Sequence, residues 1–369
     1  MRNTQVARIG IAAIGAYVPP WRVGNDWFGN AISRKFVYQT GIVARPISTI
    51  DEVTMALHAA EDLRRASGCD WRKCAGIIFS SPSFIPPGIA NKYLNAPRAR
   101  HEDLLSAAGR FARQLGTYRQ PICALNWFCS GYARALAIAQ HRHLTTPMKR
   151  DEFMLVINAN RISRITDFEC RQTGALFGDL ATATMLSRED SSVYPTRFNL
   201  LYAAAKTVPT DAAYFDFHLR ESVLVPQRNG GRHRVPQRVV FSLNGPAIAD
   251  AAPRAMSAAL TEALLATRVH PRDVKFVVPH QAGTGIVRLA SMKFESSGLA
   301  GEVINGITGD VANVSSCSIP FALKATWNRL DGMIACPAAA VGIPGRSEMT
   351  QGCILLQSVT SRECIARAA

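Results

Sequence analysis

The sequence predicts an α/β protein made of two duplicated halves, with two sheets and helices between and outside them. Three observations support this prediction. Several strand-length stretches are continuously apolar, which is typical of sheets buried on both faces. Alanine-rich amphipathic segments separate these stretches. The same series of elements recurs in the same order in the second half of the chain.

The elements pair along the chain as follows. Residues 1–20 carry two arginines and an apolar run, which we interpret as an opening strand that ends at Pro19 and Pro20 rather than as a secretory signal. Four pairs of segments then match between the halves: 53–67 and 74–81 with 247–269 and 274–280, 122–140 with 302–327, 152–161 with 332–342, and 174–187 with 350–359. We therefore expect an N-terminal half over residues 1–190 and a C-terminal half over residues 191–369.

An inserted segment at about residues 91–115 has no counterpart in the other half. Its last part predicts an amphipathic helix, because one face carries a set of apolar side chains: Leu104, Leu105, Ala108, Phe111, Ala112 and Leu115. This face docks either on the body of the protein or on a partner subunit, and the pattern leaves both options open.

A second unmatched segment, residues 226–238, sets four arginines around an Asn-Gly-Gly turn between prolines. It predicts an exposed hairpin or a flexible loop. The arginines are Arg228, Arg232, Arg234 and Arg238. They are either simply solvated or contact an acidic carrier protein or a phosphate.

Composition narrows the function classes. Lys and Arg outnumber Asp and Glu by 42 to 27, a formal charge of +15, so the surface attracts acidic partners. No basic run or nucleic-acid-binding motif accompanies this charge, so we expect no nucleic-acid partner. No apolar stretch is long enough to span a membrane. The nine cysteines form no C-x-x-C pair or metal-ligand spacing, which favours reduced thiols in a cytoplasmic protein without a metal site.

Three polar residues fall where the repeat puts strand ends: Cys129, His280 and Asn313. Cys129 lies at a predicted strand-to-helix turn, where the start of the helix stabilises a thiolate. Asn313 occupies the position that corresponds to Cys129 in the second half. Each residue also has a structural interpretation, as a core thiol, a hydrogen-bonded histidine or a turn asparagine. Two halves that face each other would bring all three together.

The local sequences around these residues identify a family. "CSGYARALAIA", "VVPHQA" and "ANVSSCSIPFAL", with "TGI" at 40–42 and "LFGD" at 176–179, resemble the β-ketoacyl-acyl-carrier-protein synthase III family of the thiolase superfamily. The resemblance implies a five-layered α-β-α-β-α fold, usually dimeric. It implies that Cys129 is the acylated nucleophile and that its backbone N–H serves the oxyanion hole. His280 and Asn313 are then its active-site partners.

The sequence departs from the family at the cofactor-binding positions. Lys35 and Gln39 stand where the family holds the adenine of coenzyme A between a Trp and an Arg, whereas Arg171 matches the arginine on the other side of the adenine. A glycine-rich loop of the family is replaced by "GIPGRSEMTQG", which puts the second oxyanion N–H near Ser347. We therefore expect a reshaped substrate site.

Two aromatic residues, Trp127 and Phe128, replace the small residues that commonly precede the cysteine. They either bind the acyl group or fill the core. The enlarged 91–115 segment lies where the family contacts its dimer partner, so it suggests a homodimer or a pairing with a related subunit.

From this resemblance we expect an acyltransferase that loads Cys129 from a thioester and condenses the acyl group with a malonyl-type thioester, in specialised metabolism. Alternatives are an O- or N-acyltransferase that forms an ester or amide, and a catalytically silent acyl-binding subunit. A papain-like hydrolase fits less well, because it has its cysteine near the N-terminus and no duplication. We expect no permanently bound cofactor: acyl-coenzyme A or an acyl carrier protein is the substrate.

Overall fold

The computed structural model describes residues 7–84 and 103–359. Ten strands join into one sheet in the order β12-β11-β13-β14-β8-β1-β7-β6-β4-β5. The first half of the chain supplies β1 (Ile9–Tyr17), β4 (Cys74–Ser80), β5 (Ile122–Leu125), β6 (Phe153–Asn160) and β7 (Leu180–Arg188). The second half supplies β8 (Phe198–Pro209), β11 (Val274–Val277), β12 (Glu302–Val303), β13 (Met333–Val341) and β14 (Glu348–Ser358).

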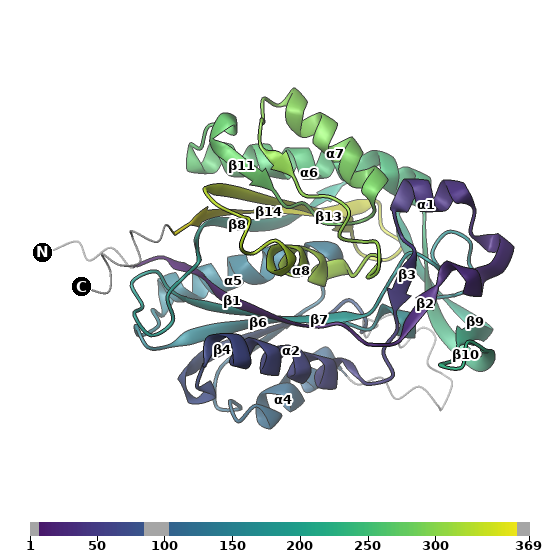
Figure 1. Cartoon of the computed structure of the whole chain (residues 1–369), viewed down its shortest axis with the longest axis horizontal. Coiled ribbons are helices and arrows are strands. Elements are labelled where there is room, and N and C mark those ends of the chain that lie inside the picture. Colours follow the sequence, from purple (N-terminus) through teal and green to yellow (C-terminus); the bar gives the residue numbers. More distant parts are fainter. Residues whose placement is uncertain (1–6, 85–102, 360–369) are drawn as a thin grey trace, which may run out of the picture.

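Helices cover both outer faces of this sheet and fill the space between its two halves (Figure 1). The α-helices are α1 (Arg34–Thr40), α2 (Glu52–Ser67), α4 (Leu104–Gln114), α5 (Gly131–Thr145), α6 (Gly245–Thr267), α7 (Thr284–Ser296) and α8 (Ser318–Ala325). Short 3-10 helices are η1 (Asn25–Ala31), η2 (Trp71–Lys73), η3 (Phe128–Ser130), η4 (Ile162–Arg164), η5 (Pro271–Asp273) and η6 (Ser315–Cys317). Five layers follow one another. Helices α2 and α4 cover the half-sheet of the first half, helices α5 and α8 lie between the two half-sheets, and helices α6 and α7 cover the half-sheet of the second half.

The two halves have the same strand topology. From the centre outwards, β1-β7-β6-β4-β5 repeats as β8-β14-β13-β11-β12, and β4 and β11 each pair in parallel with both of their neighbours. The predicted duplicated five-layered fold is therefore confirmed. The segments matched between the halves in the sequence did not include β1 and β8. These two strands join the half-sheets through two residue pairs, Gly10–Asn199 and Ile11–Phe198. The boundary at 190/191 falls between β7 and β8, and the exact domain bounds stay a prediction.

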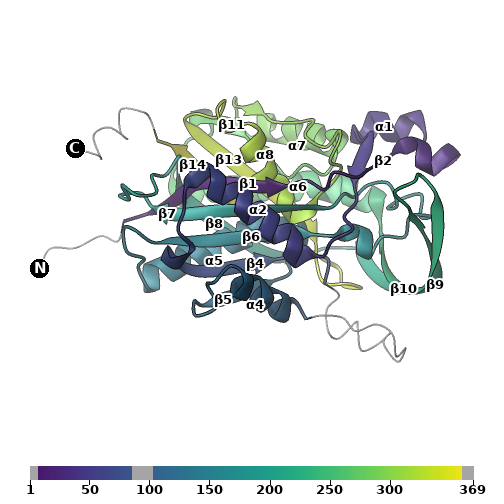
Figure 2. The ribbon, with the colours of Figure 1, turned by 60° about the horizontal axis from the view of Figure 1, so that its bottom comes forward.

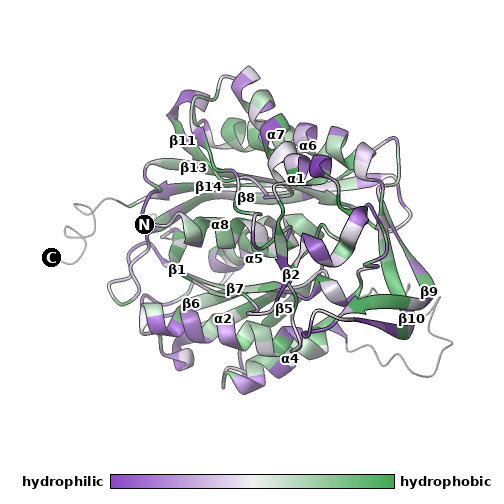
Figure 3. Cartoon of the chain, turned by 45° about the vertical axis from the view of Figure 1, so that its right-hand side comes forward, coloured by the Kyte–Doolittle hydropathy of each residue, from purple (hydrophilic) through white to green (hydrophobic). Residues whose placement is uncertain are grey.

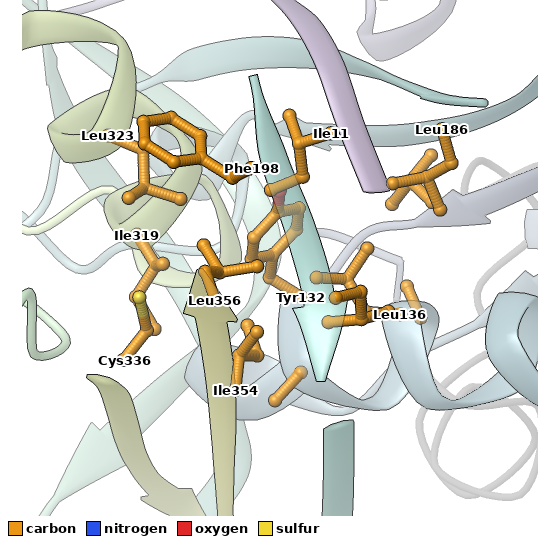
Figure 4. Close-up of a cluster of buried hydrophobic side chains, with 14 of the residues drawn as sticks. Ile11, Tyr132, Leu136, Leu186, Phe198, Ile319, Leu323, Cys336, Ile354 and Leu356 are labelled. Atoms are coloured by element: carbon orange, nitrogen blue, oxygen red, sulfur yellow. The ribbon is translucent and has the colours of Figure 1, made fainter. Parts of the chain in front are cut away.

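The central layer is held by apolar side chains of α5. Tyr132, Leu136 and Ala139 are fully buried, and Figure 4 shows Tyr132 and Leu136 within the central cluster of apolar side chains. The hydroxyl of Tyr132 lies 3.3 Å from that of Thr184 on β7, so its one polar atom is partnered. Burying each large apolar side chain contributes about 1.5–3 kcal/mol, and this packing fixes the start of α5.

The amphipathic helix of the inserted segment, α4, docks on the body of its own chain, against α2 and β5. Its buried side chains are Ala107, Ala108, Phe111 and Ala112. Leu105, expected on the same face, is instead 56% exposed because it lies on the solvent side of the helix. Hydrophilic stretches mark the outward sides of α2, α4 and α7, whereas the strands are mainly hydrophobic (Figure 3). Residues 91–102 lie outside the described residues.

The basic segment, residues 226–238, belongs to a long hairpin. Of the two predicted alternatives, a hairpin and a flexible loop, the hairpin is therefore confirmed. Its strands β9 (Phe215–Pro226) and β10 (Arg232–Leu243) stand at one end of the molecule, beside α1 and the short strands β2 (Arg22–Gly24) and β3 (Ala44–Pro46) (Figures 1 and 2). Phe215, Phe217 and Phe241 at its base pack against Ile162 and Ile165. The hairpin is thus a wall of this end of the protein. Within the described ranges, none of the helices has the length and apolar character that a membrane crossing requires.

Candidate active site

Cys129 lies at the turn between β5 and α5, as the sequence predicted. The 3-10 helix η3 carries it, and α5 begins two residues later. Phe128 adopts a left-handed φ of 43°, which costs a non-glycine residue about 1–3 kcal/mol. The packing of α5 and the bond from the Phe128 N–H to the side-chain oxygen of Asn126, 3.4 Å, hold this strained turn. Cys129 is consequently partly exposed, and it lines a cavity rather than the core.

The thiol of Cys129 has one side-chain partner, the hydroxyl of Ser315 at 3.4 Å. Burial raises its pKa to about 11, although the Ser315 hydroxyl and the backbone N–H of Cys129 act in the opposite direction. This differs from the expected thiolate. The start of α5 lies close by, but among residues 7–84 and 103–359 no cation acts on the sulfur, and the loss of hydration outweighs both hydrogen bonds. The free protein therefore holds a neutral thiol at pH 7.

His280 follows β11 and enters the same cavity. Its backbone N–H donates to the carbonyl of Pro337 on β13 at 2.9 Å, which fixes the residue at the end of the strand. The ring is buried, and burial lowers its pKa to about 4. Its Nδ1 has no hydrogen-bond partner in the part of the chain that the structure describes. The imidazole is therefore neutral at pH 7, so one ring nitrogen is a donor and the other an acceptor.

Asn313 is held by its backbone and by its side-chain oxygen. Its N–H donates to Leu176 at 2.9 Å and its carbonyl accepts from Gly178 at 3.1 Å, so the residue is tied to the start of β7. Its Oδ1 accepts from the N–H of Ser315 at 2.9 Å. Since a backbone N–H can bond only the oxygen of the amide, the NH₂ group is the end that remains free to donate.

One cavity of about 630 Å³ is lined by Cys129, His280, Asn313 and Ser315 together. Side chains from both halves of the chain therefore converge, as expected from the duplication. The remaining lining is mostly apolar and comes from α1, η4, the hairpin, α6, α7, β13 and β14. Exposed polar residues of the lining, among them Gln39, Arg171 and Arg288, mark where the cavity meets solvent.

The structure corrects the expected match between Cys129 and Asn313. Both halves have a 3-10 turn before the inner helix, η3 before α5 and η6 before α8, and both turns begin with a residue of positive φ, Phe128 and Ser315. In this register the counterpart of Cys129 is Ser316. Asn313 lies three residues earlier, on the approach to the turn, which lets it line the cavity rather than begin the helix.

The expected oxyanion donor Ser347 does not lie at the cavity. It is exposed, and its carbonyl accepts from the N–H of Thr210 at 2.9 Å. The reason is that β13 and β14 stay paired as far as Val341 and Met349, so the loop that joins them extends past the cavity into solvent. A sequence alignment cannot show how far such a hairpin stays paired.

The remaining predicted binding residues separate into two groups. Phe128 and Arg171 line the cavity, as does Gln39. Trp127 does not: it packs against the central core, with the guanidinium of Arg134 4.8 Å from its ring centroid. For Trp127 the core-filling interpretation is therefore correct, because the turn directs consecutive side chains to different sides. Lys35 is exposed and lies outside the lining.

Ser315 is the residue that the sequence reasoning missed. A serine two positions after Asn313 carries no chemical signal by itself. The signal lay in the repeat, since the turn of the second half places Ser315 where Phe128 stands in the first. Its hydroxyl contacts the candidate nucleophile and its N–H orients the candidate amide.

Known proteins are similar to this chain in sequence. The family model for 3-oxoacyl-[acyl-carrier-protein (ACP)] synthase III matches residues 124–200, which include Cys129. The β-ketoacyl-[acyl-carrier-protein] synthase III of Clostridium beijerinckii is 26% identical over 334 residues, 88% of this chain and 92% of that protein.

Solved structures agree in fold. The 3-oxoacyl-[acyl-carrier-protein] synthase III of Aquifex aeolicus superposes with a TM-score of 0.70 at 24% identity, over 95% of this chain and 99% of that one. The priming β-ketosynthase of the R1128 polyketide pathway gives a TM-score of 0.68 at 19% identity, over 97% and 99%. The matched family model, the curated relative and the shared fold support a relationship of this chain to the β-ketoacyl-acyl-carrier-protein synthase III family, at modest identity.

Proposed function

We propose that this protein transfers an acyl group through a thioester on Cys129 and condenses it with a malonyl-type thioester. The observation that carries the proposal is the single cavity lined by Cys129, His280 and Asn313 from both halves of the chain. Each group has the chemical character its step requires: a thiol that exchanges with thioesters, a neutral imidazole, and an amide whose NH₂ end is free.

In the first step the sulfur of Cys129 attacks the carbonyl carbon of an acyl thioester. The neutral ring of His280 accepts the thiol proton as the new carbon–sulfur bond forms, because a thiol with a pKa of about 11 does not ionise ahead of the attack. The old carbon–sulfur bond then breaks, and the departing thiol takes the proton. We assign the N–H of Cys129 and the hydroxyl of Ser315, which lies 3.4 Å from the sulfur, as the donors to the developing oxyanion.

In the second step a malonyl-type thioester loses carbon dioxide. The electron pair of the broken carbon–carbon bond moves onto the thioester oxygen, where one N–H of His280 and the NH₂ of Asn313 stabilise the charge. Such donors each contribute about 3 kcal/mol to a transition state. The enolate carbon then attacks the acyl carbonyl, and the electron pair of the carbon–sulfur bond returns to Cys129. The resulting thiolate takes a proton from water, which restores the neutral thiol. A neutral His280 suits this role because it keeps a donor without carrying a charge.

The donor is an acyl chain on coenzyme A or on the phosphopantetheine arm of an acyl carrier protein. Arg171 and Arg288 at the opening of the cavity favour an anionic donor, and the net charge of +15 favours an acidic carrier protein. We further propose a role in specialised metabolism and a dimer, either with itself or with a related subunit. The mass of the protein in solution, alone and with candidate partners, tests the dimer.

The test of the transfer is an intact-mass measurement after incubation with a panel of acyl thioesters. We expect an acyl adduct that Cys129→Ala abolishes and that Cys123→Ala retains, since Cys123 is also partly exposed but lies outside the cavity lining. Malonyl thioester is then added, and a 3-oxoacyl product is expected.

The acceptor decides between the versions of the transfer. If hydroxyl or amine acceptors give an ester or amide and no 3-oxoacyl product forms, the protein is an O- or N-acyltransferase rather than a condensing enzyme. If no thioester forms an adduct, the proposal is overturned, and the catalytically silent acyl-binding subunit is the remaining alternative.

A further inference from the structure

Four phenylalanine side chains line one part of the cavity, and they come from four separate segments of the chain. They are Phe128 of η3, Phe177 before β7, Phe215 of β9 and Phe241 of β10. The ring centroids of Phe128 and Phe215 lie 4.9 Å apart, and the two rings meet edge to face at 68°. Phe241 lies 6.0 Å from Phe215 and 5.3 Å from Phe177, which it meets edge to face at 81°. We call this continuous surface the phenylalanine wall.

The phenylalanine wall adjoins the candidate catalytic groups at both of its ends. Phe128 directly precedes Cys129 in the chain. Phe177 pairs with Asn313 through an isolated backbone bridge. All four of these residues line the same cavity, so an acyl group on the sulfur of Cys129 lies beside the wall.

Exposure distinguishes the opening of the cavity from its buried part. Gln39, Arg171 and Arg288 are exposed, whereas Phe215 and Phe241 are only 6% and 4% exposed. A thioester donor keeps its large polar carrier at the opening, so its acyl end takes the buried part. Among the described residues that line the cavity, the only Lys, Arg, Asp or Glu side chains are the two arginines at the opening. A charged acyl group would lose its hydration beside the wall without gaining a partner, so the wall selects an uncharged one.

We propose that the acyl group is aromatic, so that the donor is the thioester of an uncharged aryl-substituted carboxylic acid. This inference rests on the proposed function and names its substrate class. Phe128 and Phe177 are only partly buried although they line the cavity, so their rings keep surface that faces it. A further ring packed there takes the edge-to-face or offset arrangement that aromatic pairs prefer and that the wall already shows. A saturated group of the same size lacks this interaction.

The test compares two donors that differ only in the aromaticity of the ring, 3-phenylpropionyl-coenzyme A and 3-cyclohexylpropionyl-coenzyme A. With either donor, the sulfur of Cys129 bonds to the carbonyl carbon and the carbon–sulfur bond of the donor breaks. The thiol proton passes by way of His280 to the departing thiol. Burial alone does not favour the aryl donor, because the cyclohexyl group is no less apolar. We expect the adduct on Cys129 to form at least about threefold faster from the aryl donor.

Leucine variants locate the source of this preference. Phe215→Leu and Phe241→Leu each remove one ring of the wall, and either variant that folds, as judged by its Tm, should bring the ratio of the two rates to about one. Phe217→Leu is the matched control and keeps the preference. Phe217 is also buried and packs 4.9 Å from Phe215, but it is not among the described residues that line the cavity. Equal rates in the wild-type protein, a preference that both wall variants retain, or its loss in Phe217→Leu overturns the proposal.

Binding without transfer separates this inference from the proposed function. The Cys129→Ala variant has no thiol at this position, so calorimetry measures its affinity for both donors, with coenzyme A alone as the reference for binding at the opening. We expect the aryl donor to bind at least about threefold more tightly. If no thioester loads Cys129 in the wild-type protein but the aryl donor still binds more tightly, the proposed transfer fails and the aromatic site stands. If both donors load and bind equally, the transfer stands and the aromatic acyl group is refuted.

Discussion

The burial of the candidate nucleophile makes a sharp prediction about its reactivity. With a pKa of about 11, Cys129 is ionised in only about 10⁻⁴ of the molecules at pH 7. Alkylation by iodoacetamide proceeds through the thiolate, so its rate at Cys129 should rise about tenfold with each unit from pH 7 to pH 9 without a plateau. Mass mapping of the peptide that contains Cys129 separates this reaction from those of the other thiols.

The Ser315→Ala variant extends the same test. The hydroxyl of Ser315 lowers the pKa of the thiol, so its removal raises that pKa further. A net hydrogen bond of about 1 kcal/mol corresponds to an approximately fivefold slower alkylation at any pH in this range. Ser296→Ala, on the exposed end of α7, is the control and leaves the rate unchanged. A rate that levels off below pH 8 would show that the start of α5 stabilises the thiolate after all, and the argument from desolvation would be wrong.

Three further predictions concern the fold around the site. The pKa of His280 in the folded protein, about 4, lies below its ordinary value of 6.5, so the stability it contributes is fully present above pH 6.5 and is lost as the pH falls to 4. In denaturant unfolding, the free energy of unfolding of His280→Gln should therefore fall by about 3 kcal/mol less than that of the wild-type protein over this range. A methyl group at Gly131 would lie 2.7 Å from the hydroxyl of Ser80, so Gly131→Ala should destabilise the protein by about 1–3 kcal/mol and slow acylation. Wild-type values of both would contradict the close packing at the start of α5. Phe111→Ala should lower the free energy of unfolding by about 3–5 kcal/mol, because Phe111 is fully buried. The control Leu105→Ala, at an exposed position of the same helix, should lower it by less than about 0.5 kcal/mol. An equal loss in both variants would mean that α4 is not docked as described.

The contrast between Trp127 and Phe128 shows where sequence reasoning stops. The two aromatics are neighbours of Cys129 and had the same alternatives, yet one packs in the core and the other lines the cavity. The positive φ of Phe128 separates their directions, and a backbone angle of this kind in a non-glycine residue leaves no mark on the sequence. The same angle at Ser315 places a hydroxyl on the candidate nucleophile.

The sequence by itself determined the duplicated α/β architecture and the three candidate groups, because strand periodicity, helix amphipathicity and the order of elements are local and repeat along the chain. The fold confirms the architecture, and Cys129, His280 and Asn313 line one cavity. Only the tertiary structure decided that the thiol of Cys129 is neutral and that Ser347 lies away from the cavity. These outcomes depend on desolvation and on how far a hairpin stays paired, and such effects arise only when distant segments pack together.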